Sequence, residues 1–275
     1  MANVSLESVK ILRERLGAGM VDSKNALIEA DGDIEKAIEI LRLKGMKGVA
    51  KREGRATSEG LVAAKESASS VTMIELACET DFVSKNEKFI ALGNQVLEAV
   101  AAANAADVSA ALAADAGGKT VEAVINDEAA ILGEKVELRR VVRLEGENFA
   151  VYLHQTSKDL PPQVGVVVAY TGSDAETARA IAMHISFADP LYLTREDVPQ
   201  ADVDKERELV TEISKNEGKP EAALPKIIEG RLTGYFKQVA LLEQDYSRDN
   251  KLTIAQVLDQ AGIAVTGFAR FKVGA

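Results

Sequence analysis

The chain has 275 residues, of which 47% are hydrophobic, so it is long enough to form two or three domains that each bury a core. Its 33 basic and 43 acidic residues give a formal net charge of −10, which excludes a general nucleic-acid-binding protein, because such a protein needs a positive surface. Cys78 is the single cysteine, which excludes an intramolecular disulfide and is typical of a reducing compartment.

The N-terminal residues predict neither a signal peptide nor a membrane anchor. They lead directly into a charged amphipathic pattern, and no apolar run approaches the roughly 20 residues that a membrane-spanning helix needs. We therefore expect a cytoplasmic protein that does not contact membranes and, because of its charge, does not bind nucleic acid directly.

Residues 4–44 predict a small module of three helices, and we expect this domain to span residues 1–54. Apolar residues recur at helical spacing in three segments, and glycine-containing breaks at 17–20 and 31–33 separate them. Met20 lies in the first break, where it either contacts a partner or fills the small core of the module. Residues 42–55 carry six basic side chains and one acidic side chain, which predicts either a solvated connector or a contact with an acidic surface.

From residue 59 the pattern changes to that of strands. Leu61–Ala64 and Val71–Ala77 predict two paired strands joined by a serine-rich turn, and an amphipathic helix begins near Glu87. The polar segment between them places Phe82 in a loop at a strand-to-helix junction, although aromatic residues make up only 4% of the chain. Phe82 either projects as an apolar wedge toward a partner or folds back onto the core to anchor the helix.

The next segments continue the mixture of helices and strands, so the predicted fold class is α+β with antiparallel sheets. The expected elements are a helix at Thr120–Leu132, a hairpin formed by Lys135–Glu145 and Phe149–His154, a strand at Val164–Thr171, and a helix that Ser173 caps and that ends near Phe187.

A weak internal repeat indicates two related subdomains. A hairpin followed by a helix occurs at 60–103 and again at 148–187. We interpret the two copies as α+β subdomains at 55–140 and 141–275.

The C-terminal third predicts a protruding, charge-rich helical hairpin at about 200–235 and a smaller module at about 245–275. The apolar positions of the two helices pack against each other, and the exposed face offers a surface either for a homodimer or for a partner protein. The C-terminal module is expected to contain a short helix and a final strand.

The sequence contains no recognisable catalytic or cofactor-binding motif. Gly117–Thr120 suggests a phosphate loop, but that signature needs a glycine five places before Gly118, where the chain has Ala113. Neither of the two histidines has metal-ligand spacing with Cys78, which ends a strand and is expected to pack inertly. We therefore expect no cofactor and no bound metal, and a binding protein rather than an enzyme.

Four segments, in order along nearly the whole chain, resemble signatures of the bacterial translation elongation factor Ts family. They are LRERLGAGMVDSKNAL at 12–27, CETDFV at 78–83, HI at 184–185 with PLYL at 190–193, and GRL at 230–232 with LLEQ at 241–244. The chain departs from the family pattern at Gln155–Gln163, where the loop is longer and contains Pro161 and Pro162. The departure lies beside His154, which the family pattern would make a contact histidine.

The resemblance implies a guanine-nucleotide exchange factor for the GTPase elongation factor Tu. In that family the N-terminal module resembles ubiquitin-associated domains and contacts the nucleotide domain of the GTPase. A loop wedges between helices of the GTPase, disturbs its Mg²⁺ site and loosens the phosphates. Carried over to this sequence, Phe82 is the apolar plug, Asp81 reorganises polar contacts, and Thr80 and Val83 hold the loop. Met20 and His154 are carried over as further partner contacts.

Two other functional hypotheses remain open from the residues themselves. An adaptor would use its ubiquitin-associated-like module to bind other proteins and would have no exchange activity. An enzyme would use Cys78 or a pair of acids.

Overall fold

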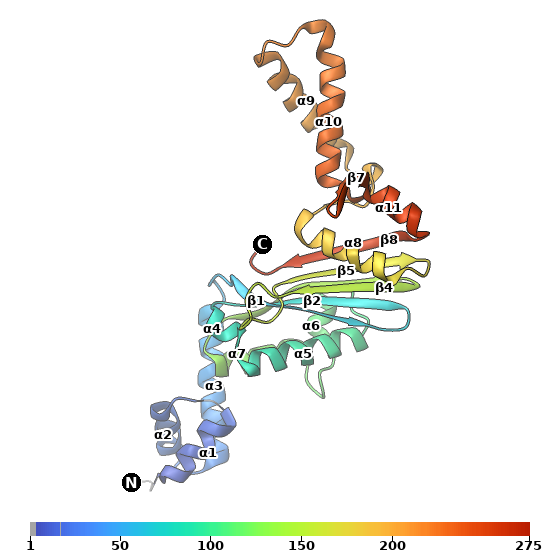
Figure 1. The fold of residues 1–275 in the computed structure, drawn as a ribbon. Helices are drawn as coiled ribbons and strands as arrows, with labels where there is room; N and C mark the ends of the chain where they lie inside the picture. Colours follow the sequence, from blue (N-terminus) through green and yellow to red (C-terminus); the bar gives the residue numbers. More distant parts are fainter. Residues whose placement is uncertain (1–3, 17) are drawn as a thin grey trace.

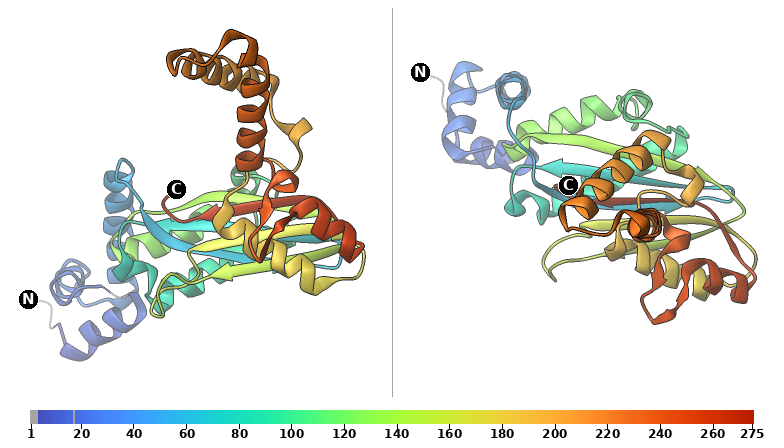
Figure 2. Two further views of the ribbon diagram at one scale, coloured as in Figure 1. Left: turned by 45° about the horizontal axis from the view of Figure 1, so that its top comes forward. Right: turned by 90° about the horizontal axis from the view of Figure 1, so that it is seen from above.

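The computed structural model describes residues 4–16 and 18–275, and over these residues the fold is α+β, as predicted. Two three-stranded antiparallel sheets of the described chain stack face to face, and helices cover the outer face of each sheet (Figure 1). A helical module lies at the N-terminus, and a helical hairpin projects from the stack on the opposite side (Figure 2). No helix of the described chain is long and apolar enough to cross a membrane.

The first sheet has the strand order β1-β2-β3. Its central strand β2 is buried at every position, because the second sheet covers one face and helices cover the other. Phe89 lies on the inner face of α5 and is fully buried in the core between helices and sheet. The elements are β1 (Glu59–Glu66), β2 (Ser70–Cys78), α4 (Asp81–Ser84), α5 (Glu87–Ala102), α6 (Val108–Ala113), α7 (Val121–Leu132) and β3 (Val136–Glu145).

The second sheet has the strand order β4-β5-β8, and its outer face is covered by α8 and α11. Asp174 caps α8 by accepting a hydrogen bond from the Thr177 backbone N–H at 2.9 Å, so the helix begins one residue later than Ser173 capping predicts. The elements are β4 (Asn148–His154), β5 (Val164–Thr171), α8 (Ala175–Ala188), β6 (Asp245–Tyr246), β7 (Asp249–Thr253), α11 (Ile254–Ala261) and β8 (Ala264–Lys272).

The predicted hairpin of residues 135–145 and 149–154 is wrong, although both strands exist. β3 pairs with β2, whereas β4 pairs with β5, so the two strands belong to different sheets. The central strands β2 and β5 are buried on both faces, so their backbone groups need a neighbouring strand on each edge. This requirement outweighs pairing across the short turn. Both predicted hairpin-and-helix units are nevertheless present, as β1-β2-α5 and β4-β5-α8.

The three N-terminal helices enclose a small core of their own, which includes Leu12 and Leu27. The third helix continues through residues 42–52, so most of the basic segment is helical. The third helix packs closely on α7: a Cβ added to Gly45 of the third helix would lie 2.7 Å from the Cβ of Ala130 on α7. The helices are α1 (Leu6–Leu16), α2 (Met20–Glu29) and α3 (Ile34–Arg52).

The projecting hairpin consists of two antiparallel helices that pack through Val210, Leu232 and Phe236. Leu209 and Ile213 lie one turn apart on its exposed surface. The hairpin elements are η1 (Arg195–Asp197), α9 (Gln200–Asn216), η2 (Glu221–Ala223), α10 (Leu224–Val239) and η3 (Leu241–Glu243), where η marks a 3-10 helix.

Candidate functional site: the junction between β2 and α5

The loop that follows β2 forms a single helical turn, α4, before α5 begins. Within this turn Val83 and Ser84 are buried, whereas the ring of Phe82 is 74% exposed. The interpretation of Phe82 as an anchor of the helix is therefore wrong. Phe89, on the first turn of α5, is the aromatic residue that fills the core at this junction.

A single cation joins the two outward-facing residues of the turn. The Lys85 ammonium group lies 4.5 Å from the centre of the Phe82 ring and 3.1 Å from Oδ2 of Asp81. The ion pair connects residues one helical turn apart and is partly exposed, so it contributes little to folding. Its consequence is local: it places a positive and a negative charge beside an exposed aromatic ring.

Glu134, which lies between α7 and β3, holds the start of this turn. Its Oε2 accepts hydrogen bonds from the backbone N–H groups of Glu79 (3.1 Å) and Thr80 (3.0 Å), and its Oε1 accepts one from the Thr80 hydroxyl (2.6 Å). Thr80 is the N-cap residue of α4, but its side chain does not cap the helix because the hydroxyl is used in this contact. The predicted role of Thr80 in holding the loop is consistent with this geometry.

The thiol of Cys78 supports the same turn from beneath. Its Sγ donates to the Thr80 carbonyl oxygen at 3.3 Å. Burial, followed by the negative charge of Glu134, raises the pKa of the Cys78 thiol, so the group stays protonated and remains a donor. A buried thiol with a raised pKa is a poor nucleophile, which counts against the hypothesis of a thiol enzyme.

Met20 and His154 lie on other elements. Met20 is the first residue of α2 and is 57% exposed, so it does not fill the core of the N-terminal module. His154 ends β4, is exposed, and its Nδ1 lies 3.2 Å from the Tyr152 hydroxyl. The structure therefore does not join Met20, Phe82 and His154 into one pocket.

The ends of β2 and β4 nevertheless lie at the same end of the sheet stack. The Gln163 backbone N–H donates to the carbonyl oxygen of His154, and its side chain donates to Glu59, which is opposite Cys78 in the β1-β2 register. The long loop 155–163 is part of this connection. At the same end Arg55, just after α3, forms an ion pair with Glu79 at 3.1 Å and so connects the segment after the N-terminal helices to the loop.

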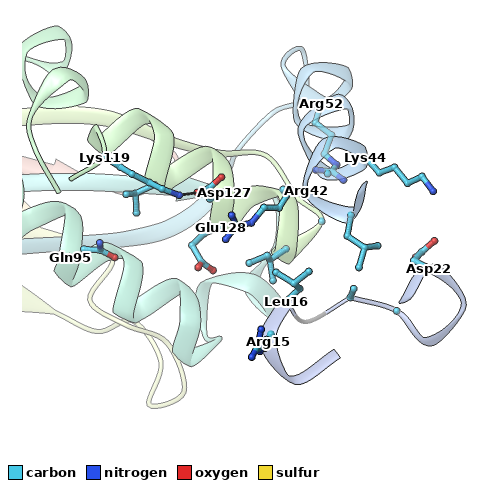
Figure 3. Close-up of a pocket in the computed structure, with 18 of the residues that line it drawn as sticks. Arg15, Leu16, Asp22, Arg42, Lys44, Arg52, Gln95, Lys119, Asp127 and Glu128 are labelled. Carbon is cyan, nitrogen blue, oxygen red and sulfur yellow. Dashed lines mark hydrogen bonds and ion pairs between the residues drawn. The ribbon is translucent and has the colours of Figure 1, made fainter. Parts of the chain in front are cut away.

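A cavity of about 740 Å³ lies between the N-terminal module and α7, beside the close contact of α3 with α7 (Figure 3). Arg42 and Arg52 of α3 line it on one side, and Asp127 and Glu128 of α7 line it on the other. Part of the basic segment thus faces carboxylates of the same chain. This mixture of charges favours neither an anion nor a cation, and among the described residues no cluster of three His, Cys, Asp or Glu side chains is placed to hold a metal ion.

Comparison with known proteins identifies the family. The model of the family described as "Elongation factor TS" matches residues 79–275. The chain belongs to the elongation factor Ts family. It is similar to "Elongation factor Ts" of Clavibacter sepedonicus (70% identity), of Leifsonia xyli subsp. xyli (69%) and of Tropheryma whipplei (55%), each match covering 100% of both chains.

The resemblance to the elongation factor Ts signatures is confirmed by this membership, and the chain is a translation elongation factor. The family match begins at Glu79, which is the first residue of the loop described above. Glu134 is a member of the site that sequence reasoning missed. The only local signal was a glutamate directly after Gly133, between a predicted helix and a predicted strand.

Proposed function

We propose that this chain is a guanine-nucleotide exchange factor that binds elongation factor Tu in its GDP-bound form and promotes the replacement of GDP by GTP. The observation that carries the proposal is the exposed ring of Phe82 on a single helical turn whose flanking residues are held in the core and by Glu134. Phenylalanine is enriched at protein–protein contacts, so an exposed Phe82 ring on an ordered turn supports a contact with a partner protein.

In this mechanism Phe82 inserts into the partner and Asp81 disturbs the polar contacts around the partner's Mg²⁺ ion. A GTPase holds GDP through Mg²⁺ and through contacts to the phosphates. Insertion of the loop would therefore weaken the binding of Mg²⁺ and the contacts to the phosphates together. Thr80 and Val83 keep the turn in place, since Thr80 is hydrogen-bonded to Glu134 and Val83 is buried. The chain itself makes and breaks no covalent bond in this process and needs no cofactor.

The energetics require more than one contact. Each tenfold acceleration of GDP release corresponds to about 1.4 kcal/mol of barrier. Burial of one phenylalanine contributes about 1.5–3 kcal/mol, so Phe82 accounts for one or two powers of ten. The exposed Met20 and His154 are the proposed additional contacts on other elements. The factor must bind the nucleotide-free partner more tightly than the nucleotide-bound partner, so binding of GDP or GTP must in turn weaken the complex.

The test measures the release of fluorescent GDP from elongation factor Tu by stopped flow. We expect Phe82→Ala to slow the release promoted by this chain by about ten- to a hundredfold, in line with the burial estimate. Leu209→Ala, which removes an exposed apolar side chain on the projecting hairpin, is the matched control and should leave the rate unchanged. If a folded Phe82→Ala variant promotes GDP release at the wild-type rate, the wedge mechanism is wrong.

A further inference from the structure

Two glutamate carboxylates accept backbone hydrogen bonds from the opposite strand at the point where the β2-β3 ladder ends. Cys78 and Val136 are the last pair in the register, so Glu79 and Lys135 are the next residues opposite each other. The Glu79 carboxylate accepts the Lys135 backbone N–H at 2.6 Å, and the Glu134 carboxylate accepts the backbone N–H groups of Glu79 and Thr80. Side-chain carboxylates thus continue the ladder where the backbones separate.

This arrangement matters because α4 is too short to maintain its own geometry. A helix of four residues lies below the length at which helix formation becomes favourable, so its position depends on tertiary contacts. Val83 and Ser84 fix its buried side. Just before α4, the backbone N–H groups of Glu79 and Thr80 and the Thr80 hydroxyl all donate to the one carboxylate of Glu134.

We propose that Glu134 is the positioning residue of the exchange loop, which holds α4 so that Phe82 is presented to the partner in the geometry that speeds GDP release. This inference rests on the proposed exchange function. Glu134 acts through Thr80 and α4 rather than by touching the partner's nucleotide. Its contribution therefore lies in the order of the loop before the partner arrives, which limits the entropy lost on insertion.

The first experiment measures how fast the full chain carrying Glu134→Gln promotes GDP release from elongation factor Tu. A glutamine keeps the size of the side chain but has one acceptor oxygen and no charge, so it reverses or loses the bond to the Thr80 hydroxyl and weakens the charge-assisted bonds from the two backbone N–H groups. We expect the maximal release rate to fall about tenfold, which is about 1.4 kcal/mol of barrier. The concentration of factor that gives half of this rate should change less than about threefold, because the contact surface itself is retained.

The control variant is Glu122→Gln, which removes an exposed carboxylate from α7 and should leave both parameters unchanged. Thr80 offers a second pair of variants. Thr80→Ser retains a hydroxyl donor for Glu134 and should promote GDP release from the partner at nearly the wild-type rate. Thr80→Val lacks the donor and should lower the maximal release rate as Glu134→Gln does.

A double-mutant cycle with Phe82→Ala separates positioning from a general loss of stability. If Glu134 acts by presenting Phe82, then Glu134→Gln should slow release little further in the Phe82→Ala background. Fully additive effects would overturn the inference. The inference would also be overturned if Glu134→Gln left the maximal rate of GDP release unchanged while Phe82→Ala lowered it. That outcome would leave the proposed exchange function intact.

Hydrogen exchange tests the arrangement without the partner. The amides of Glu79 and Thr80 should exchange slowly in the wild type and at least about tenfold faster in Glu134→Gln, while amides in the centre of β2 stay protected. Equal exchange at Glu79 and Thr80 in the two proteins would overturn the role of Glu134. If the wild-type chain does not accelerate GDP release at all, the proposed function falls and the inference falls with it.

Discussion

The two hairpin-and-helix units differ most at the junction between the second strand and the helix. In the first unit, residues 79–86 connect β2 to α5 and include the helical turn with Phe82. In the second unit, only residues 172–174 connect β5 to α8. The same architecture is thus completed by three residues in one unit, so the extra residues in the other exceed what packing of the helix on the sheet requires.

The two junctions are also held by different means. In the short junction the start of the helix is capped by a neighbour in sequence, since Asp174 accepts hydrogen bonds from the backbone and the hydroxyl of Thr177. The long junction relies on Glu134, which is more than 50 residues away. A helix start that needs only a local cap folds with its own segment, whereas a turn that presents an exposed aromatic ring needs support from elsewhere in the fold.

The largest expected effect distinguishes the two aromatic residues of the first unit. Phe89→Ala removes a fully buried ring and should lower the free energy of unfolding by about 3–5 kcal/mol. Phe82→Ala removes an exposed ring and should change it by less than about 0.5 kcal/mol. Urea denaturation monitored by circular dichroism measures both. Similar losses in the two variants would mean that Phe82 belongs to the core.

The second prediction breaks the short junction. Gly172 has a φ of +96°, and a Cβ added there would lie 2.6 Å from the carbonyl oxygen of Gly262. Gly172→Ala should therefore lower the free energy of unfolding by about 2–3 kcal/mol, through backbone strain and this contact together. Gly117→Ala is the matched control, since Gly117 has a φ of +90° but open space around it, and should cost about 1 kcal/mol.

Thermal unfolding of the two glycine variants measures the difference. In the Gly172→Ala background, Phe82→Ala should slow GDP release as much as it does in the wild type, because Gly172 lies in the other unit. Equal losses of stability in the two variants would show that the approach to Gly262 contributes nothing.

Sequence patterns predicted the features of the fold that depend on neighbouring residues. The paired strands around residues 61–77 and the helix from Glu87 follow from the periodicity of their apolar side chains, and the structure confirms them. The choice of partners for β3 and β4 was predicted wrongly, since it depends on β2 and β5, which lie elsewhere in the chain. A short turn made a hairpin look favourable, but a local signal carries no information about a competing distant strand.

The candidate site shows the same division. The polar residues around Phe82 indicated a functional loop, because an aromatic side chain in a polar segment is visible in the sequence itself. Whether the ring was exposed depended on Phe89, which takes the buried position in the structure. The contact between Glu134 and Thr80 could not be predicted, because it arises only after α7 and β3 have packed beside β2.

The smallest expected effect concerns the helix of the second unit. The inner face of α5 carries Phe89, whereas α8 buries His184, whose Nε2 lies 2.9 Å from Oε1 of Gln244. The Gln244 amide N–H₂ donates to the carbonyl oxygen of Gln238, near the end of α10, so it is the oxygen of Gln244 that faces the histidine. His184 thereby connects α8 to the base of the projecting hairpin.

Burial lowers the pKa of His184, and the hydrogen bond to Gln244 opposes this change only in part. The folded protein therefore takes up a proton at this ring at lower pH than the unfolded chain, whose histidine titrates near about 6.5. Its contribution to stability is complete above that pH and is lost as the pH falls toward the lower pKa of the folded state.

We expect the melting temperature to fall more steeply between pH 7.5 and 5.5 in the wild type than in His184→Gln. A glutamine at this position keeps a donor for Gln244 but has no proton to gain in this range. His154→Gln, at the exposed histidine, should retain the wild-type slope. Parallel slopes in wild type and His184→Gln would show that the buried ring does not couple protonation to folding. If only His184→Gln reduces the dependence of the melting temperature on pH, the pH-sensitive contact is the one between His184 and Gln244. This contact lies at the base of the projecting hairpin, away from the junction that presents Phe82.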